Sequence, residues 1–213
     1  MSHALPALTP LEARILGVLV EKEKITPDAY PLTLNSLASG CNQKTSRDPV
    51  MSVSESEIQA ALEALRARIL VLETYGASGR VLRYAQNFGK VYGLPAASVA
   101  LLAILMLRGA QTVSELRANC ERLYRFDDAS SVEAYLEELA ERSSSALVLR
   151  LSKQAGSREH RWVHLLCGEP SLPAEQVKVR DTGLSSHAAL EERVARLEHE
   201  LAELREMIGR ITG

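Results

Sequence analysis

Hydrophobic and polar positions along the chain follow one order twice: three helix-like stretches, then two strand-like stretches. In the first copy, LEARILGVLV (11–20), LTLNSLASGC (32–41) and SESEIQAALEALRAR (54–68) carry apolar residues three and four positions apart, the spacing of amphipathic helices. Two β-rich runs around the turn GASG follow, and this arrangement predicts a β-hairpin. The pattern therefore predicts three helices and a hairpin within residues 1–94.

The second copy, residues 95–167, repeats this order. ALLAILMLRG (100–109) corresponds to the first helix, QTVSELRANC (111–120) to the second and SSVEAYLEELAER (130–142) to the third. Helix, helix, helix and hairpin is the order of a winged helix, a recognition module. We therefore expect a mainly α protein with small β-wings (α+β), built from tandem winged-helix domains.

Local signals place several helix boundaries. Thr9 before Pro10 predicts a helix start, and Glu12 completes a capping box. Ser54 predicts the start of the third helix. The positions that recur along this helix predict one buried face, made of Ile58, Leu62, Leu65 and Ile69.

The first helix of the second copy contains VALLAILML, which is apolar on all sides. A helix of this kind is expected to be buried all round, either against the first domain or across a dimer. Cys41 and Cys120 occupy equivalent repeat positions, which favours core roles. The spacing of the three cysteines fits neither a disulfide framework nor a zinc site.

The C-terminal part of the chain has a different pattern. Residues 168–187 are rich in Pro, Gly and Ser and predict a linker. Residues 188–213 then carry apolar positions alternately four and three apart, which predicts a short coiled coil and a homodimer. A helix folded back on its own domains is the alternative. The candidate dimerisation residues are Leu190, Val194, Leu197, Leu201, Leu204 and Ile208.

Charge adds little attraction for nucleic acid. The formal net charge is −2, with +1 in residues 1–94, zero in residues 95–167 and −3 in the tail. The chain therefore lacks an overall basic field. It also lacks a signal-peptide pattern at its start and an apolar run of the roughly 20 residues that a membrane span requires. We expect a soluble, cytoplasmic protein that does not bind membranes.

Signatures of catalysis are absent: the sequence contains no phosphate-binding glycine loop, no nucleophile elbow and no zinc-protease motif. His160 and His164 share one side of a predicted strand, with Trp162 between them, and no third metal ligand is evident. We expect no enzymatic activity, no cofactor and no metal.

The leading functional hypothesis is DNA binding by a regulator-like protein, with the first domain as the reader. The polar segment before the third helix offers phosphate and base-edge contacts, and the wing adds two cations. The candidate DNA-binding residues are Asn42, Gln43, Lys44, Thr45, Ser46, Arg47, Arg80 and Arg83. Against this hypothesis, the third helix carries Glu55, Glu57 and Glu63, which repel phosphate.

The alternative is a protein-interaction adaptor that uses its winged helices and acidic helix faces to bind a protein partner without binding DNA. The third helix of the second copy favours this reading, because four glutamates lie along it: Glu133, Glu137, Glu138 and Glu141. A continuous basic stripe from Lys44 to Arg83 would favour DNA, and a mixed-charge, partly apolar surface would favour a protein partner.

Several runs resemble the YceH family of uncharacterised bacterial proteins. They include LEARILGVLVEKE (11–23), YPLTLNSLASGCNQKTSRDPVM (30–51), LRGAQTVSELR (107–117) and LEHELAELRE (197–206). NQKTSRDPVM is the most specific of them. The resemblance implies a tandem winged-helix fold with a C-terminal helical tail in the bacterial cytoplasm. It implies no biochemical activity and no site residues.

Overall fold

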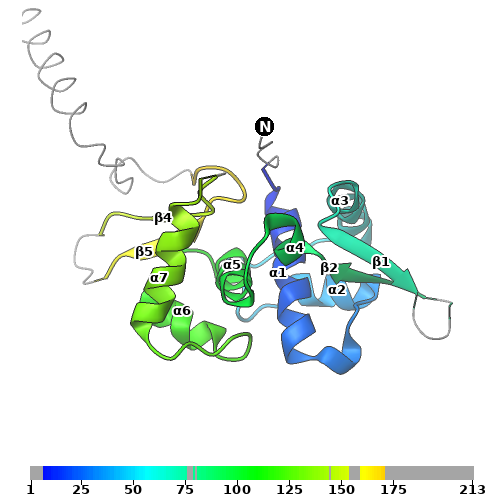
Figure 1. Ribbon diagram of the computed structural model, residues 1–213. Coiled ribbons are helices and arrows are strands. Elements are labelled where there is room, and N and C mark those ends of the chain that lie inside the picture. Colours follow the sequence, from blue (N-terminus) through cyan, green and yellow to red (C-terminus); the bar gives the residue numbers. More distant parts are fainter. Residues whose placement is uncertain (1–6, 76–78, 80, 144, 154–158, 171–213) are drawn as a thin grey trace, which may run out of the picture. The chain divides into compact units, whose positions relative to one another are not determined.

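A computed structural model describes residues 7–75, 79, 81–143, 145–153 and 159–170. These residues belong to one compact unit, and they form helices with small antiparallel sheets (Figure 1). The α+β class expected from the sequence is thereby confirmed. The predicted coiled coil, with its six dimerisation residues, lies outside the described residues, as does most of the predicted linker. No helix among the described residues is long and apolar enough to cross a bilayer.

The first repeat contains the predicted helices and hairpin. Its elements are α1 (Pro10–Ile25), a 3-10 turn (Pro27–Ala29), α2 (Leu34–Cys41), α3 (Glu55–Ala67), β1 (Val71–Tyr75) and β2 (Leu82–Gln86). β1 and β2 form an antiparallel pair that projects away from the helices (Figure 1). A short helix, α4 (Phe88–Tyr92), follows β2 and leads to the second repeat.

The second repeat has the same order with one addition. Its elements are α5 (Ala96–Arg108), β3 (Gln111–Thr112), α6 (Val113–Cys120), α7 (Ala129–Ala140), β4 (Val148–Arg150) and β5 (Arg161–His164). The two-residue strand β3 pairs with β5, which gives a three-stranded sheet in the order β3–β5–β4.

The predicted caps are present. The Thr9 hydroxyl accepts a hydrogen bond from the Glu12 backbone N–H (3.2 Å), and the Glu12 carboxylate accepts one from the Thr9 N–H (2.7 Å). Ser54 and Glu57 form the same capping box at the start of α3. Each box pairs donors that the first helical turn would otherwise leave unpaired, so both helices begin where the sequence predicts.

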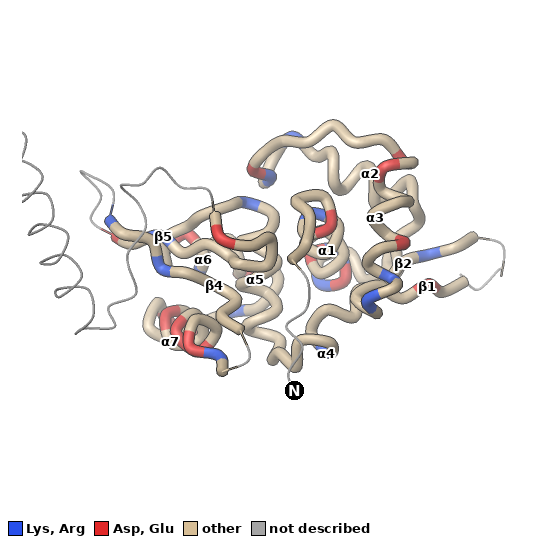
Figure 2. The backbone as a smooth tube through the Cα atoms, turned by 90° about the horizontal axis from the view of Figure 1, so that it is seen from above, with Lys and Arg blue, Asp and Glu red and all other residues tan. Residues whose placement is uncertain are grey.

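α1 and α5 lie side by side at the centre of the unit (Figures 1 and 2) and make its most extensive contact between helices. Every residue of α5 from Ala97 to Leu107 is buried, which confirms burial against the first repeat. Gly17 of α1 permits this close approach, since a Cβ there would lie 2.9 Å from Leu107 Cγ. The two repeats therefore share one continuous hydrophobic core.

Ile69 departs from the predicted buried face of α3. Ile58, Leu62 and Leu65 are buried, but α3 ends at Ala67, and Ile69 is 60% exposed with a φ of 59°. The regular spacing of apolar residues in the sequence continues to Ile69, two residues beyond the end of the helix. The prediction that Ile69 is buried was therefore wrong. Its left-handed backbone conformation is also strained, because its side chain is β-branched.

Replacing Ile69 with asparagine is expected to stabilise the protein by about 1 kcal/mol, because asparagine tolerates the left-handed conformation far better. Urea denaturation followed by circular dichroism measures the change. Val50→Asn is the matched control, since Val50 is similarly exposed without a positive φ. A loss of stability in Ile69→Asn would contradict the strain argument.

Candidate functional site

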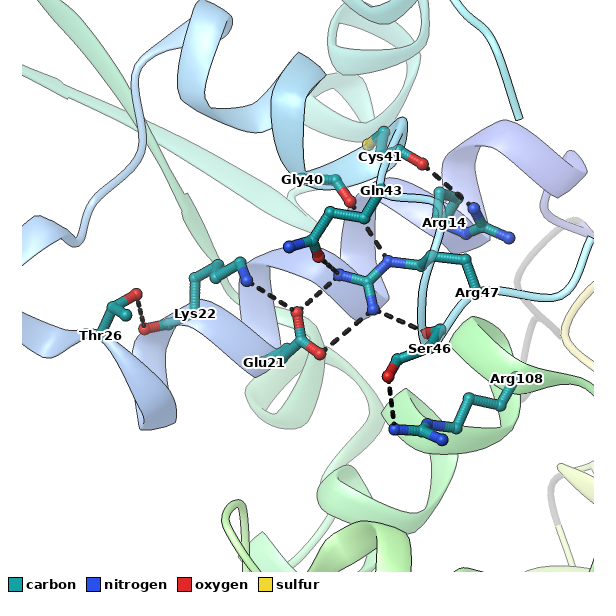
Figure 3. Close-up of polar contacts among 10 residues, drawn as sticks. All are labelled: Arg14, Glu21, Lys22, Thr26, Gly40, Cys41, Gln43, Ser46, Arg47 and Arg108. Atoms are coloured by element: carbon teal, nitrogen blue, oxygen red, sulfur yellow. Dashed lines mark hydrogen bonds and ion pairs between the residues drawn. The ribbon is translucent and has the colours of Figure 1, made fainter. Parts of the chain in front are cut away.

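The polar segment between α2 and α3, residues 42–53, is the main site candidate of the sequence. It lies against α1 and reaches the C-terminal end of α5 (Figure 3). Its side chains divide into those held inside the protein and those exposed to solvent. This division decides which of them can contact a ligand.

Arg47 is the most buried charged side chain of the segment, at 6% exposure for the residue. Its guanidinium donates to both carboxylate oxygens of Glu21 on α1, at 3.2 and 2.6 Å. It also donates to the Gln43 side-chain oxygen (2.5 Å) and to the backbone carbonyls of Gly40 (3.2 Å) and Ser46 (2.8 Å) (Figure 3). The donors of Arg47 are thus used within the protein.

The electrostatics of this pair are those of a buried ion pair. Burial by itself would raise the pKa of Glu21, but the hydrogen bonds and charge of Arg47, with a contribution from Lys22, lower it below its ordinary value. Glu21 therefore stays ionised and holds Arg47 in place. Lys22 completes the contact, with its ammonium 3.2 Å from the same carboxylate.

Asn42 and Gln43 are also engaged inside the protein. The Asn42 side chain donates to the Val53 carbonyl and accepts from the Val53 N–H, both at 2.8 Å. This pair of bonds ties the two ends of the segment together. The Gln43 side-chain oxygen accepts a hydrogen bond from Arg47. Both amides thus already form hydrogen bonds within the protein, and these would have to break for the same atoms to contact a base.

The segment also fastens the first repeat to the second. The Asp48 N–H donates to the Leu107 carbonyl at the end of α5 (2.8 Å), and the Arg108 guanidinium donates to the Ser46 hydroxyl (2.8 Å). From α1, buried Arg14 donates to the carbonyl oxygens of Cys41 (3.1 Å) and Pro49 (2.6 Å). The NQKTSRDPVM stretch is therefore a structural connection between α1, α2 and α5.

The remaining predicted contacts are spread over the surface. Lys44, Thr45 and Ser46 are exposed, and Lys44 forms no ion pair among the described residues. Arg83 on β2 is half-buried and donates to the Pro31 carbonyl (2.7 Å). Arg80 lies outside the described residues. Among the candidates that the structure describes, three neighbours, Lys44, Thr45 and Ser46, are exposed together.

Carboxylates line the outer side of α3, where Glu55, Glu57 and Glu63 are exposed. Near its end, Arg66 forms an ion pair with Glu73 of β1 (2.6 Å), and Arg68 pairs with Glu12 of α1. Lys/Arg and Asp/Glu positions occur on both repeats without separating into a basic and an acidic side (Figure 2). The described surface is therefore one of mixed charge.

The hairpin has one covered edge and one open edge. The backbone N–H of Tyr84 in β2 donates to Leu32 (2.8 Å) and its carbonyl accepts from Leu32 (3.1 Å). Glu73 of β1 stands directly opposite Tyr84. Because Tyr84 turns its backbone groups outward, Glu73 does so as well, and two residues further on Tyr75 repeats this orientation. No hydrogen bond to these β1 groups occurs in the described part of the chain.

Apolar side chains accompany this open edge, a feature that the sequence reasoning missed. Leu72 to Tyr75 are all exposed, and Tyr75 reaches 69%. Leu72 and Val81 are each close to half exposed. A long exposed edge strand is a template for pairing with another chain. Finding it requires the strand register, which the sequence alone does not supply.

The histidines and cysteines that the structure describes show no site of their own. Cys41 and Cys120 are fully buried, and burial raises the pKa of each thiol to about 12, so the predicted core role is confirmed. Burial lowers the pKa of His164 to about 4, while His160 contacts the Leu151 carbonyl (3.0 Å). In the ranges that the structure describes, no group of His, Cys, Asp or Glu is arranged to hold a metal.

The fold and this site define an α+β protein made of two similar helix-and-hairpin repeats joined through α1 and α5. Residues 8–157 match the family model described as "Protein of unknown function, DUF480", and the chain belongs to this family. The resemblance to the YceH family seen in the sequence is thereby confirmed.

Relatives of similar length occur in other bacteria. The UPF0502 protein of Dechloromonas aromatica is 52% identical over 98% of this chain and 97% of its own length. That of Leptothrix cholodnii is also 52% identical, over 96% of this chain and 93% of the relative. The UPF0502 protein of Paraburkholderia phymatum is 60% identical over 82% and 73%. Their names state no activity.

Proposed function

We propose that this chain is a protein-interaction adaptor built from tandem winged helices, and that its first repeat binds a partner protein along the open edge of β1. The order α1–α2–α3–β1–β2, repeated by α5–α6–α7–β4–β5, supports the winged-helix assignment. In this assignment α3 is the third helix and the β1–β2 hairpin is the wing. The chain is a non-enzymatic recognition protein.

The observation that carries the proposal is the outward-facing backbone of Glu73 and Tyr75. A partner segment in extended conformation adds to such an edge by main-chain hydrogen bonds, and its alternate side chains fit the surface on either side. β2 offers no equivalent site at Tyr84, since Leu32 already covers it. Within the described part of the first hairpin, the open edge is therefore that of β1.

The surroundings of the edge indicate the chemistry of the partner segment. Tyr75 and Leu72 point to opposite sides of the hairpin and offer apolar contacts on both. The exposed carboxylate of Glu63 on α3 lies near Tyr84, on the side of the hairpin that packs on α3. The partner segment therefore combines apolar side chains with a Lys or Arg.

DNA binding is the second candidate, and exposed Lys44 is the observation in its favour. Of the other cations predicted to contact phosphate, Arg47 and Arg83 have partners inside the protein, and Arg80 lies outside the described residues. The exposed carboxylates of α3 repel a phosphate backbone. Among the described candidates, Lys44 is the exposed cation, and a single lysine attracts DNA weakly. The adaptor is therefore the better-supported function.

Replacing Glu73 with proline is expected to abolish partner binding while leaving the hairpin intact. Proline removes the backbone N–H that faces away from β2, and edge strands tolerate this loss. It also removes the ion pair between Glu73 and Arg66. The measurement is affinity purification from a lysate of cells that express the chain, with quantitative mass spectrometry of retained proteins. Proteins retained by the wild type and lost in Glu73→Pro are partners that bind the edge.

Glu73→Ala is the matched control, because it breaks the same ion pair with Arg66 and keeps the N–H. It should retain the partner. A parallel titration of labelled duplex DNA by fluorescence anisotropy, over a salt series, tests the second candidate with Lys44→Ala. Equal retention by both Glu73 variants, together with DNA affinity that falls steeply with salt and is weakened in Lys44→Ala, would replace the adaptor with a DNA reader.

The predicted homodimer remains a separate proposal, since the residues that suggest it lie in the tail. A dimer would present two open β1 edges to one partner or to two, and bivalence would raise the apparent affinity.

A further inference from the structure

A pocket of about 300 Å³ lies between the two repeats. Its walls come from α1, β1, β2, α4 and α5, with one residue from the segment after α6. The volume is at the lower end of the range for small-molecule sites. Its apolar lining includes Val20, Leu72, Leu94, Val99, Ala100 and Leu123.

The polar residues of the pocket differ in whether they are already engaged. Glu23 accepts a hydrogen bond from the Gln86 side chain (2.9 Å), and the Asn87 side chain donates to the Ile69 carbonyl (2.9 Å). Lys24 and Lys90 line the pocket, are exposed and form no ion pair in the described ranges. The charged groups that remain available are therefore two ammonium groups.

We propose that this pocket binds a small amphiphilic anion, a carboxylate with a short apolar tail. The tail lies against the apolar lining, and the carboxylate pairs with Lys24 and Lys90. Together with Glu23, these lysines give the pocket a net charge of about +1, which one carboxylate neutralises. This site shares Leu72 with the surface beside the open edge of β1, but it uses neither the β1 backbone nor the residue 42–53 segment. Its proposed ligand therefore does not depend on the adaptor function.

Residues of both repeats line the pocket, so a bound ligand affects how the repeats pack. Ala96 and Val99 belong to the second repeat, and Lys24 and Leu72 to the first. A bound ligand contacts both repeats at once. It therefore stabilises their packing by mass action, since the unfolded chain lacks the site.

Isothermal titration calorimetry of the full chain with sodium octanoate tests the proposal. Octanoate is expected to bind saturably with one site per chain and to raise the melting temperature. Octan-1-ol, which has the same tail without the charge, and acetate, which has the charge without the tail, should each bind more weakly. Octan-1-ol binding as tight as octanoate, or no saturable octanoate binding at millimolar concentration, would overturn the proposal.

Variants locate the binding. Lys24→Ala/Lys90→Ala is expected to weaken octanoate binding about tenfold, as two partly exposed ion pairs allow, and Lys24→Arg/Lys90→Arg should retain it. Ala96→Trp fills the pocket from an exposed position and should abolish binding. Lys44→Ala, which removes an exposed lysine elsewhere, is the control. Unchanged affinity in the double alanine variant or in Ala96→Trp would show that octanoate binds outside this pocket.

Discussion

Arg47→Ala is expected to lower the free energy of unfolding by about 3–5 kcal/mol, the usual result of removing one member of a buried ion pair. The variant leaves the buried Glu21 carboxylate without its main partner. It also removes the donors to the Gly40 and Ser46 carbonyls. Urea denaturation monitored by circular dichroism measures the loss.

Lys44→Ala is the matched control, three positions away and exposed. It should change stability by less than about 0.5 kcal/mol, as surface substitutions do. Replacing both partners, as in Glu21→Leu/Arg47→Met, should recover much of the loss, since apolar residues often substitute for a buried pair. An effect of Arg47→Ala as small as that of Lys44→Ala would show that Arg47 is free for a ligand.

The pH dependence gives a second signature of the same pair. Because the folded-state pKa of Glu21 is lowered from 4.5, its ionised form stabilises the protein above about pH 4.5. This contribution is lost as the pH falls through the lower, folded-state pKa. The stability difference between the wild type and Arg47→Ala should therefore shrink as the pH is lowered below 4.5. A pH-independent difference would assign the effect of Arg47 to its other contacts.

Arg47 and Lys44 also show where sequence reasoning ends. Both are cations of one polar segment, and nothing local distinguishes them. The partner that buries Arg47 is Glu21, 26 positions earlier on α1, so only the packed fold separates the internal cation from the exposed one. The capping boxes at Thr9 and Ser54 were predictable because donor and acceptor lie three residues apart.

The same distinction applies to the hairpin. The two β-rich runs around GASG predict a hairpin, and β1 and β2 form in these runs. Which edge is open depends on Leu32, a residue 52 positions before Tyr84. The position of Ile69 was missed for a different reason: an isoleucine in a left-handed cap lacks the glycine or asparagine that normally marks a helix end.

Gly17→Val is expected to lower the free energy of unfolding by about 1–3 kcal/mol, the range for overpacking a core. The new side chain meets Leu107 Cγ at 2.9 Å and the Ala103 carbonyl oxygen at 3.3 Å. The carbonyl belongs to the α5 backbone and cannot move aside as a side-chain end can. α1 and α5 must separate, and the contact they make joins the two repeats.

The single tryptophan shows whether this strain reaches the second repeat. Trp162 is buried in β5, so its fluorescence reports unfolding of the second repeat while Gly17 lies in the first. Because both repeats share one core, the fluorescence and circular dichroism transitions should shift together in urea. A Trp162 transition unchanged by Gly17→Val would mean that the repeats unfold independently. Leu107→Ala should cost less stability in the Gly17→Val background than in the wild type, because it relieves part of the clash. This coupling would locate the effect at the contact between α1 and α5, on which the shared core depends.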